Sequence, residues 1–530
     1  MALLTLPGCY AVQHPEAVAQ RPDHPSDPIG DRRVNPGGNL VMGLSAEPDK
    51  LDPTTSSSLY TRYVMNTICE KLYDIDASGA VVPQLASALP KVSKDGLTVT
   101  IGVRSGVRFA DGSPLNAEAV RTTLQRDLTK KDSARKSELG PIASIDAPSS
   151  TAVVVRYKTP FAPLTAALAD RAGMIMSPKA LDELGDKFSD HPTCVGPFTF
   201  VARVPQTSIT LRKDPQYYAA DQVHLDTITY RIMSDANIRA ANLRSGDIQV
   251  ADSISTQDED ALIREKGIGV LQTSSLGYQA MTINLGNVHG AGSPPGKIDT
   301  PLATDPRVRL ALAYAVDRGG LVNSVFNNWY EPACSPISPA SVYATPVSDA
   351  CVPHDPAKAR ELLQQAGVTI PFPISVKTSN TAEALRYAAA LQAALEPAGF
   401  ALRIEPVEYS TLLDEQTSGD FEAILLGWSG RIDPHGNMNS FLTTGGGNNY
   451  SGYSNAHVDD LMDKAAQSTD TAERAKLYGS VMTQVRRDNP IIYLYRIRNL
   501  AAYSTDVAGA EVYPDGVVRL SRVAFVDQEG

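Results

Sequence analysis

The feature that most restricts the fold is a regular alternation of helix and strand patterns between Asp355 and Trp428. Asp355-Pro356 predicts the start of a helix, and Gly367 is expected to end it through a left-handed cap. This alternation predicts a parallel, doubly wound sheet with right-handed crossovers, whose ligands bind beyond the carboxyl ends of the strands. The later strands are expected over 372–377, 401–407 and 421–428, and the later helices over 382–395 and 410–417.

The first half of the chain shows a mixed pattern of helices and strands, and the chain as a whole is expected to be α/β. Asn116 is positioned to cap a helix that runs from Ala117 toward Leu128. Helical periodicity predicts one buried helix over 307–326, begun by Asp305-Pro306. Alternating polarity predicts strands over 96–104 and 152–157, and a hairpin-like pair over 198–202 and 208–212.

The length and charge of the chain narrow the classes of protein to which it can belong. With 530 residues, against about 100–200 per domain, more than one lobe is expected. There are 48 Lys and Arg residues against 59 Asp and Glu, a net charge of −11, which opposes binding to a phosphate backbone. Nucleic acid is therefore not an expected partner. No run of about 18 or more apolar residues occurs, so no membrane-spanning helix is expected.

The N-terminal residues are read as a signal remnant and tether over 1–38. The stub from Met1 to Cys9 resembles the tail of a bacterial lipoprotein signal, although Pro7 departs from the usual small residue. The stub carries no basic residue and is shorter than a full export signal. Cys9 is the candidate lipidation site. Residues 11–38 have the composition of a solvated tether, and the globular body is expected to begin near Asn39.

The five cysteines favour disulfides over a metal site. None is spaced as C-x-x-C, so a zinc site is not expected. If Cys9 carries lipid, four remain, and an even count in an exported protein is compatible with two bridges. We expect Cys334–Cys351 to clip a Pro- and Ser-rich loop, which leaves Cys69–Cys194. Buried free thiols are the alternative.

The motifs of common enzymes are missing from the sequence. The segment from Gly427 to Arg431 reads G-W-S-G-R, which departs from the G-x-S-x-G of a nucleophile elbow at its last position. No H-E-x-x-H and no P-loop occurs, no G-x-G-x-x-G follows a strand, and residues 445–447 are read as a flexible turn. Neither catalysis nor a cofactor is therefore expected.

Several sequence blocks occur in an order that is typical of one protein family. The most specific runs from Arg104 to Leu115 (RSGVRFADGSPL) and continues with AEAV at 117–120. Over about 39–525 the chain resembles the large extracytoplasmic solute-binding proteins of bacterial ABC importers, family 5, the peptide- and nickel-binding type. The further matching blocks are 70–74, 82–86, 94–98, 196–198, 245–248, 305–309 and 311–318.

The resemblance implies a two-lobed fold of the periplasmic-binding-protein type (type II, the large cluster with an extra inserted domain). It implies that a solute is enclosed between the lobes and delivered to ABC permease subunits, without catalysis, metal or cofactor. The protein is then extracytoplasmic, in the periplasm or as a surface lipoprotein, and is expected to be a monomer. By analogy, lobe I comprises 39–65, 185–287 and 495–530, with an inserted subdomain over 66–184, and lobe II comprises 288–494.

Both the strand-end argument and the resemblance point to the segment from Gly427 through Asn437 as the place where the solute binds. Peptide-binding members have an aspartate just after the Gly-Trp pair, where this chain has Arg431. A guanidinium repels an ammonium group and favours a carboxylate or a phosphate. The alternative is that Arg431 pairs with Asp433 or another local acid and merely supports the loop.

Further candidates surround this segment, each with a structural alternative. Trp428 is an expected aromatic wall or a cover for the sheet end, and Glu47 an ammonium ligand or an exposed surface acid. Tyr278 is expected to face the gap between the lobes or to be simply packed. Asn437 and Tyr450 offer polar contacts or are turn residues. The complete set of candidate ligand-binding residues is Glu47, Tyr278, Gly427, Trp428, Ser429, Arg431, Asp433 and Asn437.

The favoured function is the capture of short peptides or peptide-like solutes for an ABC importer. A first alternative keeps the fold and changes the solute to an opine, an oligosaccharide, haem or a nickel chelate. A second alternative is a secreted hydrolase, which would need a nucleophile with a base or two positioned carboxylates.

Overall fold

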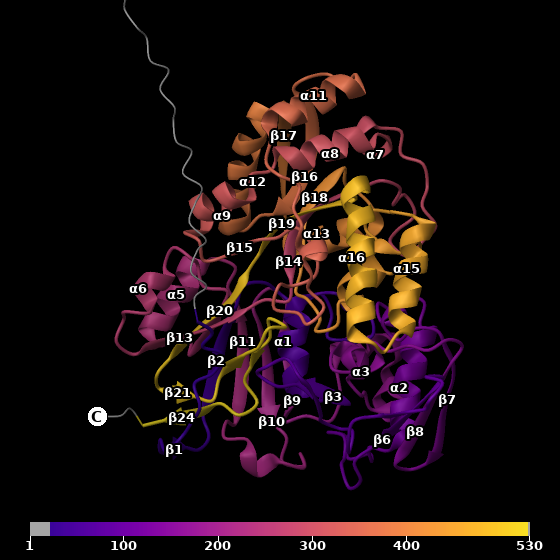
Figure 1. Ribbon diagram of the computed structural model, residues 1–530. Helices are drawn as coiled ribbons and strands as arrows, with labels where there is room; N and C mark the ends of the chain where they lie inside the picture. The colour runs from indigo at the N-terminus through magenta and orange to yellow at the C-terminus, as the bar shows by residue number, and fades with distance from the viewer. Residues whose placement is uncertain (1–21, 528–530) are drawn as a thin grey trace, which may run out of the picture.

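A computed structural model describes residues 22–527 and shows a two-lobed α/β protein (Figure 1). The lower lobe in Figure 1 is built on a seven-stranded sheet. In spatial order its strands are β13 (Ile268–Ser274), β20 (Arg498–Ser504), β12 (Val250–Asp252), β2 (Asn39–Leu44), β11 (Thr227–Ile232), β10 (Ser208–Lys213) and β9 (Phe198–Val204). The hairpin predicted over 198–212 is confirmed, since β9 and β10 pair in antiparallel fashion.

The upper lobe contains a six-stranded sheet (Figure 1). In spatial order its strands are β15 (Glu331–Pro332), β19 (Ile491–Arg496), β14 (Tyr278–Ile283), β18 (Ala423–Trp428), β16 (Phe372–Ser379) and β17 (Phe400–Val407). β16 pairs in parallel with both β17 and β18, which confirms the parallel pairing predicted from the helix and strand alternation. The complete sheet is mixed, however, because β14 runs antiparallel to β18 and β19.

The helices of this run match the sequence pattern closely. They are α11 (Pro356–Ala366), α12 (Ala382–Leu395) and α13 (Tyr409–Ser418). Asp355 accepts a hydrogen bond from the Lys358 amide at the start of α11, and Gly367 ends the helix in the left-handed conformation with φ of 70°. A residue with a Cβ would be strained at this φ, which explains glycine there.

The predicted single helix over 307–326 is wrong. The structure has two helices, α8 (Pro306–Ala315) and α9 (Arg318–Phe326), separated by Val316 and Asp317. The side chain of Asp317 accepts a hydrogen bond from the Gly320 amide, so it caps a new helix. The hydrophobic periodicity continues across Val316 and Asp317, so the sequence pattern alone does not show that Asp317 begins a second helix.

The chain crosses between the two main sheets at residues 275–277 and again at Ile497. β14 pairs with β18 and β19, so residues 278–283 lie in the upper sheet. The sequence-based division had placed them in lobe I. An apolar strand can complete either sheet, and only its long-range partners decide which one. The remaining boundaries of that division stay a prediction.

A separate four-stranded sheet lies at the lower right of Figure 1. Its strands are, in spatial order, β5 (Lys91–Val92), β6 (Thr98–Gly102), β8 (Ala152–Tyr157) and β7 (Ile142–Ser149). Helix α2 (Ala117–Thr129) packs on β7 and β8, and the Asn116 side chain caps it as predicted. This region has its own hydrophobic core, so we refer to it below as the inserted subdomain.

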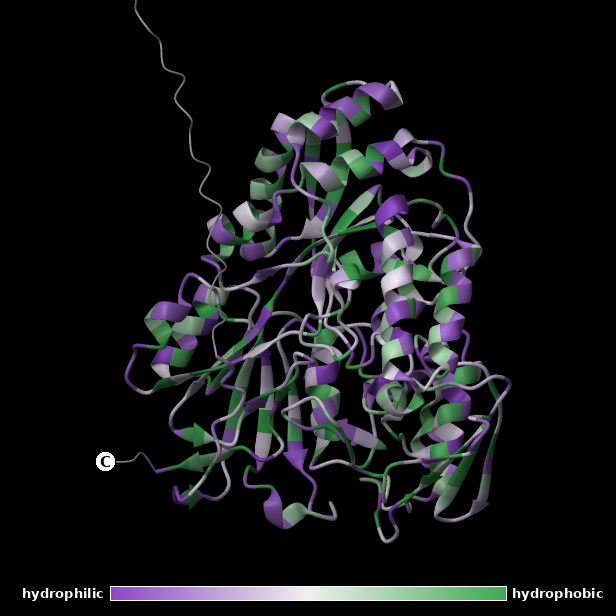
Figure 2. Cartoon of the chain, viewed as in Figure 1, coloured by the Kyte–Doolittle hydropathy of each residue, from purple (hydrophilic) through white to green (hydrophobic). Residues whose placement is uncertain are grey.

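The long helix α16 (Thr471–Asp488) shows how the upper lobe is covered. Hydrophobic and hydrophilic residues alternate along it in Figure 2, as expected of a helix with one buried side. Its apolar residues Tyr478, Val481 and Met482 are buried together with residues of the neighbouring helix α15 (Ala456–Gln467). The amide of Ala162 donates to the carbonyl of Ala466, which joins α15 to the inserted subdomain.

The cysteines pair as the sequence analysis favoured. Cys69 is bonded to Cys194, and Cys334 is bonded to Cys351. The candidate lipidation site Cys9 lies outside the described residues. Between residues 22 and 527, no helix is both long enough and apolar enough to cross a membrane.

Candidate functional site

A cavity lies between the two lobes, where strands of both main sheets end. About 290 Å³ within it is open to water-sized molecules. Ser45 and Ala46 follow β2, Ser379 ends β16, and Trp428 ends β18, so the cavity lies beyond the carboxyl ends of these strands. This is the position that the strand-end rule predicts. Other lining residues include Ser57, Tyr60, Arg239, Gln279, Tyr330, Thr381, Glu383, Tyr409, Gly427, Ser429, Phe441, Tyr450 and Tyr495.

Aromatic side chains form much of the cavity wall. The Trp428 and Phe441 rings meet edge to face with centroids 4.9 Å apart. On the lower-lobe side, Tyr60 makes the same kind of contact with Tyr409 at 5.4 Å. These rings give the cavity a rigid, mostly apolar surface that can pack against flat or aliphatic parts of a solute.

Two charged side chains line the cavity, Arg239 and Glu383. Arg239, from α5 (Ala236–Ser245), donates from Nε and Nη2 to the carbonyls of Asp252 and Ser253, at 3.1 and 2.7 Å. Its Nε also lies 3.7 Å from the Asp252 carboxylate. The charge of Arg239 is therefore balanced within the lower lobe.

Glu383 is in a different situation. Its carboxylate accepts one long hydrogen bond, 3.4 Å, from the hydroxyl of Tyr330. Burial raises the pKa of Glu383, although Arg386, Tyr330 and Arg239 act in the opposite direction. Within the described part of the chain, no Lys, Arg or His forms an ion pair with it. The cavity therefore contains one acid whose charge is not balanced by a direct partner.

The segment after β18 is held by Asn437. The Asn437 Oδ1 atom accepts hydrogen bonds from the Trp428 indole, at 3.0 Å, and from the Arg431 amide, at 2.7 Å. Its Nδ2 donates to the Arg431 carbonyl at 2.9 Å. Asn437 thus fixes the loop and orients Trp428, and it does not line the cavity, whereas Gly427, Trp428 and Ser429 do.

Arg431 lies behind Trp428 and does not line the cavity. Its guanidinium carbon is 4.2 Å from the centre of the Trp428 ring, a cation–π contact. Its Nε lies 3.5 Å from a carboxylate oxygen of Asp170 in the inserted subdomain. Burial lowers the pKa of Arg431 to about 10. The nearby Asp433 pairs instead with Arg474, at 2.7 and 2.9 Å.

Arg62, Asp170 and Arg431 together join the lobes, and we call this contact the seam. Arg62, on α1 (Leu59–Ile68), lies 2.6 Å from Asp170 and donates to the Ser429 hydroxyl at 3.2 Å. Burial alone would raise the pKa of Asp170, but the charges of Arg431, Arg62 and Arg171 hold it far below its usual value. The Asp170 carboxyl group at the centre of the seam is therefore ionised at neutral pH.

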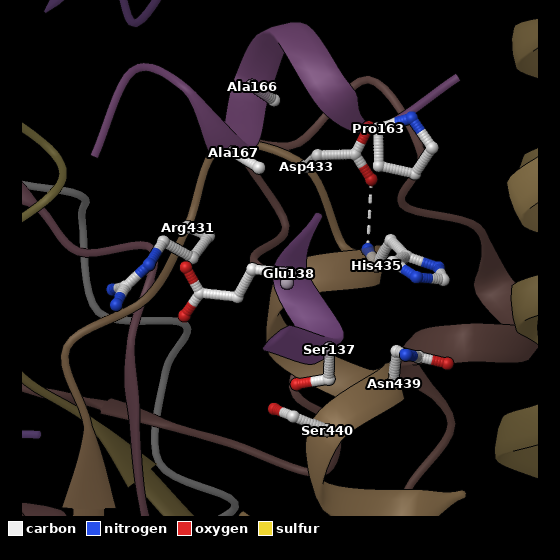
Figure 3. Close-up of a pocket in the computed structure, with 11 residues that line it drawn as sticks. Ser137, Glu138, Pro163, Ala166, Ala167, Arg431, Asp433, His435, Asn439 and Ser440 are labelled. Atoms are coloured by element: carbon white, nitrogen blue, oxygen red, sulfur yellow. Dashed lines mark hydrogen bonds between the residues drawn. The ribbon is translucent and has the colours of Figure 1, made fainter. Parts of the chain in front are cut away.

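A second, much smaller pocket lies between the upper lobe and the inserted subdomain (Figure 3). Its volume of about 20 Å³ has room for about one water molecule. The His435 ring lies edge to face against Phe161, and neither of its nitrogens has a hydrogen-bond partner among residues 22–527. Burial lowers the pKa of His435 to about 4. In Figure 3 the end of Arg431 lies beside Glu138 and points away from His435.

Two other predicted residues lie outside the cavity lining. Glu47 is buried, pairs with Arg203 at 2.7 Å and accepts from the Gln206 amide at 2.9 Å, so its charge is used inside the lower lobe. Tyr278 is buried against the rings of Tyr493 and Phe441. Tyr450, in contrast, lines the cavity.

The sequence analysis missed the first turn of α12, which brings Glu383 to the cavity. A signal for it was present, because this turn directly follows the carboxyl end of β16, the same kind of position as Trp428 after β18. As for metals, the described residues contain no group of three or more His, Cys, Asp or Glu side chains that could hold an ion.

Comparisons with known proteins identify a matching family and similar chains. The family model for bacterial extracellular solute-binding proteins, family 5 (middle part), matches residues 80–449. The glutathione-binding protein GsiB of Escherichia coli O6:K15:H31 is 27% identical over 491 residues, which are 90% of this chain and 92% of that protein.

Two solved structures share the fold. The oligopeptide-binding protein AppA of Bacillus subtilis, in complex with a nonapeptide, superposes with a TM-score of 0.83 at 24% identity, over 93% of this chain and 100% of AppA. The binding protein DppA of Helicobacter pylori, in complex with the peptide STSA, superposes with a TM-score of 0.81 at 23% identity, over 93% and 99% of the two chains.

Proposed function

This chain belongs to the family 5 extracellular solute-binding proteins of bacteria, and we propose that its cavity captures a short peptide or peptide-like solute. Proteins of this family are the substrate-binding components of ABC importers. The captured solute is then handed to permease subunits in the membrane. Exchange between an open and a closed arrangement of the lobes would let the solute enter and leave.

The observation that carries this proposal is the aromatic cavity between the lobes. Its volume of about 290 Å³ is near the lower end of the range of roughly 300–1,000 Å³ that is usual for small-molecule sites. This size favours a solute of two or three residues over a long peptide. The glutathione-binding relative supports the same size class, because glutathione is a tripeptide.

We propose a positioning role for Arg431 in place of direct contact with a solute carboxylate. Its place behind Trp428 and beside Asp170 supports this role. We also propose that the solute is bound without being altered. In support, the Ser429 hydroxyl accepts a hydrogen bond from Arg62, which is an arrangement for holding a loop rather than for activating a nucleophile.

A thermal-shift screen of the full chain, followed by calorimetry on the hits, tests the proposed solute class. The panel contains di- to pentapeptides, glutathione, opines, oligosaccharides, haem and nickel–histidine. A peptide at 100 times its Kd should add about 2.7 kcal/mol to the free energy of unfolding. Stabilisation by oligosaccharides, haem or a nickel chelate, with no response to any peptide, would contradict the proposal.

We further propose that the protein is an extracytoplasmic monomer, either in the periplasm or at the cell surface. A lipid on Cys9 would anchor it to the membrane. The support is the Leu6-Pro7-Gly8-Cys9 segment, followed by a tether-like stretch. Mass spectrometry of the protein from membranes should show the N-terminal peptide acylated at Cys9. An unmodified Cys9 peptide would rule out the anchor and leave the solute proposal intact.

A further inference from the structure

The unbalanced charge of Glu383 marks one end of the cavity. A buried carboxylate without a cation is unfavourable by several kcal/mol in general, so such groups in proteins are usually paired. Glu47, Asp170 and Asp252 are almost fully buried and each has an arginine within 4 Å, whereas Glu383 is half-buried and has none so close in the part of the chain that the structure describes. Glu383 has the long hydrogen bond from Tyr330, and the charges of Arg386 and Arg239 act on it without forming a direct ion pair among residues 22–527.

The fold holds the Glu383 carboxylate at the cavity without a direct ion pair between residues 22 and 527. Thr381 caps α12 by accepting a hydrogen bond from the Ala384 amide, and Glu383 lies in the first turn of this 14-residue helix. The positive end of the helix dipole favours an anion at this position. The carboxylate is therefore oriented toward the cavity by a rigid element and can exchange water for a ligand.

Aromatic rings surround this end of the cavity. Tyr60, Tyr330 and Tyr495 line the cavity together with Glu383, and the Tyr330 hydroxyl donates to the Glu383 carboxylate. The Tyr330 and Tyr495 rings are stacked, with centroids 5.8 Å apart and planes 5° apart. A carboxylate beside aromatic rings is a combination that attracts ammonium groups, through a charge-assisted hydrogen bond and cation–π contacts.

We propose that Glu383 binds a primary or secondary ammonium group of the solute. The proposal rests on the solute function given above and sharpens it, because it selects amine-bearing solutes and excludes those whose amine is acylated. It also places the ammonium site on α12 and not on the loop after β18.

The test compares the full chain with its Glu383→Gln variant by calorimetry, using each hit of the screen and its N-acetylated analogue. Glu396→Gln, at an exposed acid just after the same helix, is the matched control. A lost charged hydrogen bond predicts that the amine-bearing solute binds at least about 10-fold more weakly to Glu383→Gln. The acetylated analogue should bind both proteins equally weakly, and Glu396→Gln should bind like the unaltered chain.

Different outcomes separate this proposal from the proposed function. If the hit is a non-peptide amine whose binding depends on Glu383, the peptide function is wrong and the ammonium site stands. If peptides bind but neither acetylation nor Glu383→Gln weakens them by more than about 3-fold, the ammonium site is wrong. A hit without any cationic group overturns it as well. Should Glu383→Gln fold poorly, Glu383→Asp replaces it, with partial weakening expected.

Discussion

In the seam, Arg62 and Arg431 share the carboxylate of Asp170, whereas in the neighbouring cavity Glu383 has no ion-pair partner among the described residues. Both regions place charged side chains between the lobes, buried in the seam and half-buried at Glu383. In the seam the protein supplies both the arginines and the acid that pairs with them. In the cavity it supplies Glu383 without an ion-pair partner among the described residues. The comparison supports the roles proposed above, in which the seam holds the lobes together and Glu383 selects the solute.

The same comparison distinguishes the roles that we propose for Arg431 and Glu383. Arg431 is in contact with the Trp428 ring and with Asp170, so its charge is already used. Glu383 projects from a helix terminus and its charge is still available. Substitutions in the two regions should therefore have opposite signs in stability and different effects on binding.

The largest effect is expected from Asp170→Asn. Arg62 keeps its pair with Asp515 at 3.0 Å, but Arg431 is left buried without its ion-pair partner, which should lower the free energy of unfolding by about 3–5 kcal/mol. Urea unfolding measures the loss. Asp146→Asn, at an exposed pair of the same subdomain with 3.4 Å to Arg156, should change stability by less than about 0.5 kcal/mol. Equal losses in both variants would mean that the seam is no more than a surface contact.

Acidification should weaken the contact between the upper lobe and the inserted subdomain through His435. Its folded pKa of about 4 lies below the usual value of 6.5, so the folded chain binds fewer protons than the unfolded chain between these pH values. The free energy of unfolding therefore falls as the pH drops from 7 to 5, by about 2 kcal/mol for this group. The charged residues that line the same pocket are Glu138, Arg431 and Asp433, and Asp433 is paired with Arg474.

Unfolding curves at pH 7, 6 and 5 measure this effect. The His435→Gln variant should lose most of the pH dependence, while His457→Gln, at an exposed position, should keep it. If the His435→Gln variant kept the full pH dependence, other groups would be responsible for the proton uptake and the prediction for His435 would be wrong.

A smaller effect is expected from Arg431→Met. Loss of the cation–π contact and of the charge beside Asp170 should lower the free energy of unfolding by about 1–2 kcal/mol. Because Arg431 does not line the cavity, peptides with a free and an amidated carboxyl group should be weakened equally. Arg431→Lys, which keeps the charge, is the control. Selective weakening of the free-carboxylate peptides would instead make Arg431 a ligand-contacting residue.

The sequence predicted those parts of the fold that are determined by local signals. Asp355 and Gly367 mark the ends of α11 by capping, and capping depends on a few neighbouring residues. The pairing of β14 with the upper sheet depends on β18 and β19, which are far away in the chain, and no local signal reports it.

The candidate site, too, could be predicted only where a local sequence pattern determines it. Gly427, Trp428 and Ser429 follow from the end of β18, since the position of a strand end can be read from its pattern. The partner of Arg431 could not be read in this way, because Asp170 belongs to a distant segment that only the tertiary fold brings to the loop. The same limitation made Glu47 a candidate, although Arg203 already balances its charge.

The smallest effect, and the one of opposite sign, is expected from Glu383→Gln in the absence of solute. Burial raises the pKa of this carboxyl group, so its ionised form is less stable in the folded chain than in water. Removing the charge should therefore raise the free energy of unfolding at pH 7, on the order of 1 kcal/mol, even as the affinity for amine-bearing solutes falls. This gain should shrink as the pH is lowered toward the raised pKa, because the unaltered chain then also loses the charge. A destabilised Glu383→Gln variant would show that the carboxylate supports the fold, as Asp170 does, and the distinction between the cavity and the seam would disappear.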